Sequence, residues 1–475
     1  MTRSSLSTAM VALGVIWVTY SLIPISALGQ GPDGPHPPNY GNPGDPLPPG
    51  QRGTPNIKVL GNIPLGGYLH VADVEVEQEL DRPYAYVSKR FDPTGMDIIS
   101  LEDPENPELI YSWRIENSSL HQGSGALDGR YFKLDGRYYI VQSTQFGAGG
   151  PDNDLGAIVF DVTGLPDPST VREVGRITAP ETPGGFHNIF TYKHSDGRVL
   201  LFTTVNGPHA NIYDMGKFLA GDPAQGLVGQ VPVPESAYWA MRGGRASWHD
   251  YYVGFDPATQ QDRLWAGGTG GYFVFDVTDT SNPELLVSIT GVRGVAHGHT
   301  FTPSPDGLFA VGEVENQWQP LRLFDLRDAW SPAGNPVVSR AISAWTADYQ
   351  NLSHNHEVRW PFVFVSAYED GLQVFSMFDP YNPRTVAYYD TYPGPHMARG
   401  HGNVNLGAWG VDVRNADGLI VVSDMVSGLW TFKMEGFPGW DGRNWSMPNI
   451  SSAQDWDNGP RGPQPRTTSD GEKGN

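Results

Sequence analysis

The chain has 475 residues, 31 Lys+Arg against 52 Asp+Glu, a formal charge of −21, and no Cys. This negative charge would repel nucleic acid and anionic lipid, so we expect neither as a partner. The absence of Cys excludes disulfides, thiolate metal ligands and cysteine catalysis, and any metal ion must be bound by His and carboxylates.

The first 29 residues have the pattern of an export signal. Arg3 precedes an apolar run, Met10–Leu22, and small residues follow at Ala27–Gly29, where a signal peptidase could cut. The alternative is a retained membrane anchor, but the run is short for a span and is interrupted by Thr19 and Ser21. We therefore expect an exported protein, periplasmic or extracellular, with no stable membrane insertion after cleavage.

The next segment, residues 30–54, is too rich in Pro and Gly to pack and is predicted to be a linker. Residues 55–435 carry the repeats described below and are predicted to form one domain. Residues 436–475 are polar and rich in Pro and Gly, and we expect a disordered tail.

One short phrase recurs seven times at intervals of about 50 to 65 residues, which is typical of a radial repeat. Its clearest copy is an alternating apolar strand, Gly271–Asp276, followed by an Asp-closed turn and a second strand that starts at Asn282-Pro283. The other copies begin at Gly95, Gly156, His209, Pro320, Gly371 and Gly428. The pattern predicts an all-β, seven-bladed β-propeller with four strands in each blade.

The two ends of the repeat region are incomplete in complementary ways. Residues 55–63 resemble the outer strand of a blade but have no blade before them, whereas the last copy, from Gly428, lacks its outer strand. An open ring would expose strand edges, so the N-terminal strand is predicted to complete the last blade.

The phrases GLQVFSMFDPYNPRTVAYYDTYPG from Gly371 and GGYFVFDVTDTSNPELLVSITG from Gly270 resemble the repeat of the LVIVD-repeat propellers. The resemblance covers about residues 55–435. It implies a propeller of an exported bacterial type, and it implies little about activity, since most members have no assigned chemistry.

The histidines carry the chemical signal of this sequence. When the blades are aligned on their second strands, four His fall in one register at the start of the innermost strand: His187, His249, His299 and His356. Secondary candidates are His70, His297 and His354, two residues before that register, His121 in blade two, and His401 at the same mouth of the central channel.

Innermost strands line the axis of a propeller, so the four imidazoles are predicted to form a ring that could bind one copper, iron or zinc ion. Asp73, Asp250, Glu357 and Asp412 would orient the ligands, and Glu357 or Asp250 could act as a base. The alternative is a purely structural ring in which each His bonds a neighbouring carbonyl. Carotenoid cleavage oxygenases and the selenium-binding protein type of methanethiol oxidase are similar in architecture, with a metal held by axial His.

Two functions follow. The first is an exported binding or interaction propeller with a His-lined channel, which takes a small-molecule or protein ligand at its mouth. The second is a metal-dependent oxidoreductase or hydrolase that uses the His ring. The sequence contains no phosphate-binding loop, nucleophile elbow or HExxH motif, which leaves the reaction class open.

Overall fold

The computed structural model describes residues 52–442, apart from 68, 92–93, 237, 239–245, 349–350 and 394–405, together with residues 454–462. The predicted export signal, most of the predicted linker and His401 lie outside these residues. In the described part of the chain, no helix combines the length and the apolar character needed to cross a bilayer.

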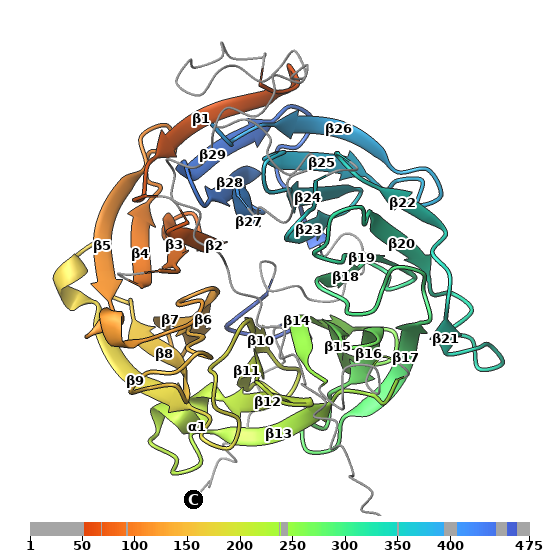
Figure 1. Ribbon diagram of the computed structural model, residues 1–475, viewed down its shortest axis with the longest axis horizontal. Helices are drawn as coiled ribbons and strands as arrows, with labels where there is room; N and C mark the ends of the chain where they lie inside the picture. Colours follow the sequence, from red (N-terminus) through yellow and green to blue (C-terminus); the bar gives the residue numbers. More distant parts are fainter. Residues whose placement is uncertain are drawn as a thin grey trace, which may run out of the picture.

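Seven sheets stand around a central axis like the blades of a propeller (Figure 1). Burial falls from the axis to the rim: every residue of β3 (Tyr84–Lys89) is buried, whereas no residue of the rim strand β5 (Glu108–Arg114) is. This gradient follows from stacking, because neighbouring blades cover both faces of the inner strands. The predicted seven-bladed β-propeller is confirmed.

In each blade the strands pair in antiparallel fashion from the axis outward. Blades one to four contain β2 (Val71–Val76), β3, β4 (Gly95–Ser100) and β5; β6 (Gly129–Leu134), β7 (Arg137–Ser143), β8 (Leu155–Asp161) and β9 (Arg172–Thr178); β10 (Ile189–Lys193), β11 (Val199–Thr204), β12 (His209–Asp214) and β13 (Leu227–Pro232); and β14 (Trp248–Asp256), β15 (Gln261–Gly268), β16 (Gly271–Asp276) and β17 (Glu284–Thr290). A short helix, α1 (Met215–Leu219), joins β12 to β13.

Blades five to seven follow the same plan. Their strands are β18 (Phe301–Pro303), β19 (Phe309–Gly312), β20 (Leu321–Asp325) and β22 (Ser343–Trp345); β23 (His356–Arg359), β24 (Phe362–Ser366), β25 (Leu372–Ser376) and β26 (Arg384–Tyr389); and β27 (Ala408–Arg414), β28 (Leu419–Asp424), β29 (Gly428–Met434) and β1 (Ile57–Ile63).

The N-terminal strand closes the ring, as predicted. β1 pairs with β29 in antiparallel register, from Ile57 opposite Met434 to Ile63 opposite Leu429, and the two ribbons lie side by side in Figure 1. Gly428, which opens the repeated phrase, has φ +94°, and a Cβ there would meet the Ile63 carbonyl oxygen at 2.1 Å. The phrase therefore needs a glycine where the rim strand passes.

Blade five differs from the repeat pattern. The phrase that should supply its rim strand contains β21 (Val337–Val338), which instead pairs in parallel with β17 of blade four. β22 takes the rim position and buries Trp345, whose indole Nε1 donates to Thr385 Oγ1 at 2.9 Å. Burying a tryptophan stabilises the blade more than burying the half-exposed Val337 would.

Part of the region predicted as a tail is packed against the propeller. In residues 454–462, Trp456 is buried against Tyr131, with ring centroids 5.9 Å apart. Gln454 Nε2 donates to the Thr191 carbonyl at 3.0 Å, and Asp457 pairs with Lys133 at 2.7 Å. These contacts place the segment at the ends of β6 and β10 that lie away from His187.

Candidate metal centre

A row of aromatic rings surrounds part of the axis where the innermost strands begin. We call it the histidine arc, and it consists of His187, His249, His299, His354 and Trp409. From blade three to blade seven, consecutive ring centroids lie 4.6, 4.1, 4.9 and 4.1 Å apart. His249 and Trp409 occupy bulges in β14 and β27, where the register skips a residue. One position of the repeat thus brings side chains from five blades together.

His356 is not a member of the arc, and the predicted register is wrong for blade six. There Ser366 N donates to the Asn355 carbonyl, as Glu313 N does to Thr300 in blade five, so His354 is equivalent to His299. His356 lies further along β23, with Nδ1 3.5 Å from Glu313 Oε2. A tight turn joins β23 to β24, and counting back from the second strand therefore selected the wrong His.

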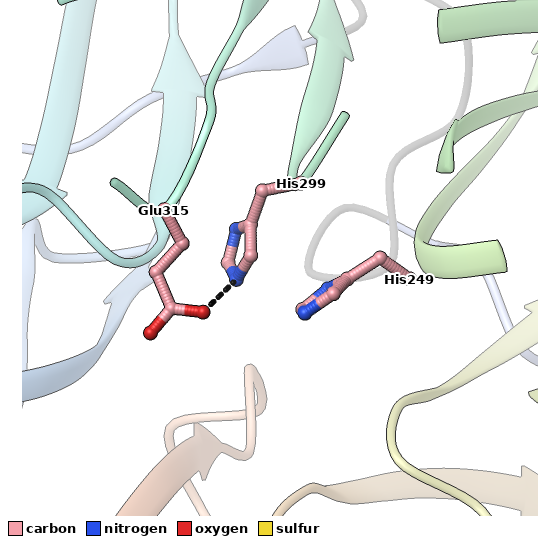
Figure 2. Close-up of side chains that lie close together, drawn as sticks. All are labelled: His249, His299 and Glu315. Carbon is pink, nitrogen blue, oxygen red and sulfur yellow. Dashed lines mark ion pairs between the residues drawn. The ribbon is translucent and has the colours of Figure 1, made fainter. Parts of the chain in front are cut away.

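The ligand atoms that converge come from His249, His299 and Glu315, all within 4.8 Å of one another (Figure 2). His299 Nε2 lies 3.7 Å from Glu315 Oε2, and this pair is the dashed line in Figure 2. Metal–ligand distances of about 2.0–2.2 Å would bring such atoms slightly closer together. Two of the four predicted ligands, His249 and His299, therefore belong to the centre, and Glu315 was missed.

A sequence signal for this carboxylate does exist. At the end of the second strand, Ser143, Thr204 and Ser366 donate their backbone N–H to Asp128, Asn188 and Asn355, the residues that follow the arc position of the repeat in blades two, three and six. Blade five has Glu313 there, followed two residues later by Glu315. A departure from a repeated hydroxyl residue to the buried Glu313 and the half-buried Glu315 marks a special blade.

Burial keeps the imidazoles of this centre neutral. Burial and the neighbouring imidazoles, chiefly His299 for His249 and His354 for His299, hold the pKa of both rings well below the usual range. Burial also lowers the pKa of His187 to about 4 and that of His354 to about 3. Neutral imidazoles have the lone pairs that a metal ion needs.

The centre contains buried nitrogens without a hydrogen-bond partner among the described residues, as His121 and His356 also do. His249 Nδ1 and His299 Nε2 are buried and have no hydrogen-bond partner in the described part of the chain. Buried polar atoms rarely stay unsatisfied, so each such atom requires an explanation. A cation between these nitrogens and Glu315 would satisfy both.

Neighbouring groups orient the ligands. His299 Nδ1 lies 2.9 Å from Thr300 Oγ1, and that hydroxyl donates in turn to Asp250 Oδ2 at 3.0 Å. Because the hydroxyl proton goes to Asp250, Nδ1 of His299 carries a hydrogen and Nε2 keeps its lone pair for the centre. Burial raises the pKa of Asp250 to about 7, with Asp128 adding to the effect. The Tyr368 hydroxyl donates to Glu315 Oε1.

The other predicted carboxylates are engaged elsewhere. Glu357 Oε2 accepts from Arg359 Nη1 at 2.7 Å, and Asp412 accepts from the backbone of Val76 and Val413. Asp73 accepts from Asn355 Nδ2 at 3.3 Å, with Arg130 nearby. Asp250 is connected to the ligand His299 through Thr300 alone, whereas Asp73 reaches it through Asn355 and Thr300.

The secondary histidine candidates likewise include some that lie beside the candidate centre and some that make contacts elsewhere. The His297 ring is 5.8 Å from His249, and its Nδ1 is 3.3 Å from Thr269 Oγ1. His121 stacks on Phe146 at 4.5 Å instead of joining the arc. The carbonyl of His70 accepts from the Arg90 backbone N–H. Among the described residues, His297 is thus the secondary candidate outside the arc that contacts a proposed ligand.

A pocket of about 430 Å³ opens beside the arc. His187, His249 and His297 line it together with residues of blades two to four. Since His249 belongs to both, the pocket gives a small molecule a route to the candidate centre.

Comparison of the chain with protein-family models and with curated proteins finds no match. The resemblance to the LVIVD-repeat propellers therefore stays a prediction, and the function must be argued from the centre itself.

Proposed function

We propose that this chain is an exported β-propeller that binds one transition-metal ion between His249, His299 and Glu315. The observation that carries the proposal is the convergence of these ligand atoms within 4.8 Å, with buried imidazole nitrogens that lack partners in the described chain. Two neutral imidazoles and one carboxylate suit iron(II) or zinc and leave coordination positions open.

A second function, a metal-dependent oxidoreductase or hydrolase, is favoured by the pocket that reaches His249. The bound ion would supply Lewis-acid or redox chemistry. The chain would orient His299 through Thr300 and Asp250, and would hold Glu315 through Tyr368. Glu357, the other predicted base, is paired with Arg359 and would take no part.

The test is the metal content of protein purified without a polyhistidine tag. Wild type should carry about one iron or zinc ion per chain, and His249→Ala, His299→Ala and Glu315→Gln should each carry less than about a tenth of that. His209→Ala at the start of β12 is the matched control, and it should keep the ion. Full metal content in the three ligand variants would overturn the proposal.

Export rests on the sequence of the first 29 residues. Protein isolated from its native compartment should begin near Gln30. N-terminal sequencing that finds Met1 or Thr2 on membrane-bound protein would indicate an anchored protein instead.

A further inference from the structure

We propose that the ends of β6 and β10 that lie away from His187 form a docking site for an acidic peptide with a tryptophan, and that residues 454–462 fill this site as an intramolecular ligand. The inference goes beyond the proposed metal centre and does not depend on it, because β10 begins beside His187 and ends at Lys193, next to the segment. In Figure 1 the segment lies beside β6 and β10.

A side chain of the segment binds the free edge of β10. This strand begins the order β10-β11-β12-β13, so its inner edge pairs with no other strand of that sheet. The side-chain amide of Gln454 occupies the edge: Nε2 donates to the Thr191 carbonyl at 3.0 Å, and Oε1 accepts from the Lys193 backbone N–H. One amide thus makes the pair of hydrogen bonds that an added strand would make there.

The segment also buries one large side chain. Trp456 is 5% exposed, and its ring meets that of Tyr131 edge to face, with centroids 5.9 Å apart. Burying a tryptophan removes about 150–250 Å² from water. A partner without an aromatic residue at this position would give up that burial and bind more weakly.

Charge complementarity identifies the partner as acidic. Lys133 lies near the end of β6 and pairs with Asp457 at 2.7 Å. Although burial lowers the pKa of Lys193 at the end of β10, the charges of Asp135, Asp457 and Asp455 oppose this effect. The aspartates on both sides of Trp456 thus face two lysines at the ends of neighbouring innermost strands.

The segment is folded as a unit of its own. Gly459 N donates to the Asp455 carbonyl at 2.7 Å, and Asn458 N donates to Asp455 Oδ1 at 2.9 Å. This turn orders Trp456 and Asp457 before they bind. The seven sheets and the closing pair of β1 and β29 are complete without the segment. Release of the segment would therefore leave every blade intact, as expected of a ligand.

The experiment measures whether a peptide in trans can replace the segment. The probe is a fluorescein-labelled peptide with the sequence of residues 454–462, and fluorescence anisotropy follows its binding to the full chain. The tethered segment competes at a roughly millimolar effective concentration, so wild type should bind the probe weakly. Trp456→Ala in the full chain removes the main anchor of the segment and should raise the affinity for the probe about tenfold or more. Trp318→Ala, at a half-exposed tryptophan of blade five, is the matched control and should behave as wild type.

Further variants test what the site recognises. Gln454→Ala in the full chain weakens the resident segment through a different contact, so the result does not depend on a single substitution. On the Trp456→Ala chain, a Trp456→Ala probe should bind about tenfold more weakly than the intact probe, and an Asp457→Asn probe about threefold more weakly. Adding Lys133→Met to that chain should weaken the intact probe about threefold, whereas adding Lys217→Met on α1 should not.

Each outcome supports or overturns the proposal. If neither Trp456→Ala nor Gln454→Ala binds the probe more tightly than wild type does, the segment is a fixed part of the fold and no docking site exists. If the Trp456→Ala probe binds as tightly as the intact probe, the site does not recognise tryptophan and the stated partner is wrong. If wild type is a dimer that the probe dissociates, a second copy fills the site, and the intramolecular assignment is wrong.

Discussion

Two polar clusters lie along the innermost strands, one at the histidine arc and one around Arg130 on β6. Arg130 pairs with Glu75 at 2.7 Å, with Asp128 at 3.2 Å and with Asp73 at 3.6 Å. Although burial opposes it, these three acids raise the pKa of Arg130 well above its usual range. In the arc, His299 and His354 are buried and His187 and His249 are half-buried, and His249 Nδ1 and His299 Nε2 have no hydrogen-bond partner among the described residues.

The difference separates a structural cluster from a candidate site. At Arg130 the chain supplies its own cation to its buried acids, so the cluster needs nothing from outside. At the arc, Arg90 lies 4.4 Å from the Trp409 ring and its charge acts on Glu315, but His249 Nδ1 and His299 Nε2 have no hydrogen-bond partner among the described residues. Burial alone therefore does not mark a site, and single unsatisfied atoms do not either, because Asp128, His121 and His356 also have them. The convergence of such atoms with a third ligand group distinguishes the arc.

The largest expected effect is at the structural cluster. Arg130→Met should lower the free energy of unfolding by about 3–5 kcal/mol, because it leaves three buried carboxylates without their cation. Denaturant unfolding measures the loss. Arg176→Met, which breaks a more exposed ion pair with Glu173 on β9, is the control and should cost about 1 kcal/mol or less. Equal losses in the two variants would mean that the Arg130 cluster is not structural.

The sequence predicted the propeller and its closure because both depend on a phrase that repeats within the chain. It predicted His249 and His299 because they occupy one position of that repeat. It misplaced His356 because the length of the β23–β24 turn decides the register, and no repeat encodes that turn. It missed Glu315 because this residue follows the second strand, so that only the folded blade brings it beside the innermost strand of blade five.

An effect of intermediate size is expected in the stability of the metal-free protein at acid pH. Burial lowers the pKa of His354 to about 3, against about 6.5 in the unfolded chain. Below about pH 6.5 the imidazole of His354 binds a proton in the unfolded state but not in the folded state. The free energy of unfolding therefore falls as the pH drops from about 6.5 towards 3. His354→Asn removes this term, and the variant should lose less stability than wild type between about pH 7 and 4.

The raised pKa values of two carboxylates have the opposite effect on how the free energy of unfolding depends on pH. These carboxylates are present in both wild type and His354→Asn. Burial raises the pKa of Asp250 to about 7 and that of Glu313 well above its usual range. Both acids make stability rise as pH falls, and they cancel when wild type is compared with His354→Asn. Urea unfolding of the two proteins at several pH values measures the difference. Parallel pH profiles would show that His354 is not held neutral by the fold.

The smallest expected effect tests whether the arc is completed by a metal ion or is merely a structural ring. Tyr368, which is fully buried, donates its hydroxyl hydrogen to Glu315 Oε1, while Oε2 faces His299. Its backbone has φ +43°, an uncommon conformation that is held by reciprocal hydrogen bonds with Ala408 at 3.0 and 2.8 Å. Tyr368 is therefore a positioning residue for the carboxylate.

Tyr368→Phe keeps the ring packed on His354, 5.3 Å away, and removes the hydroxyl alone. Without that donor the Glu315 carboxylate can turn away from the centre, so cobalt(II) affinity should fall about tenfold, while unfolding stability falls by about 1 kcal/mol. Tyr381→Phe is the control, because the hydroxyl of the exposed Tyr381 donates to Asp325 at the end of β20, and its cobalt affinity should match wild type. If Tyr368→Phe loses stability but binds cobalt as wild type does, Glu315 is held for structure and the arc needs no ion.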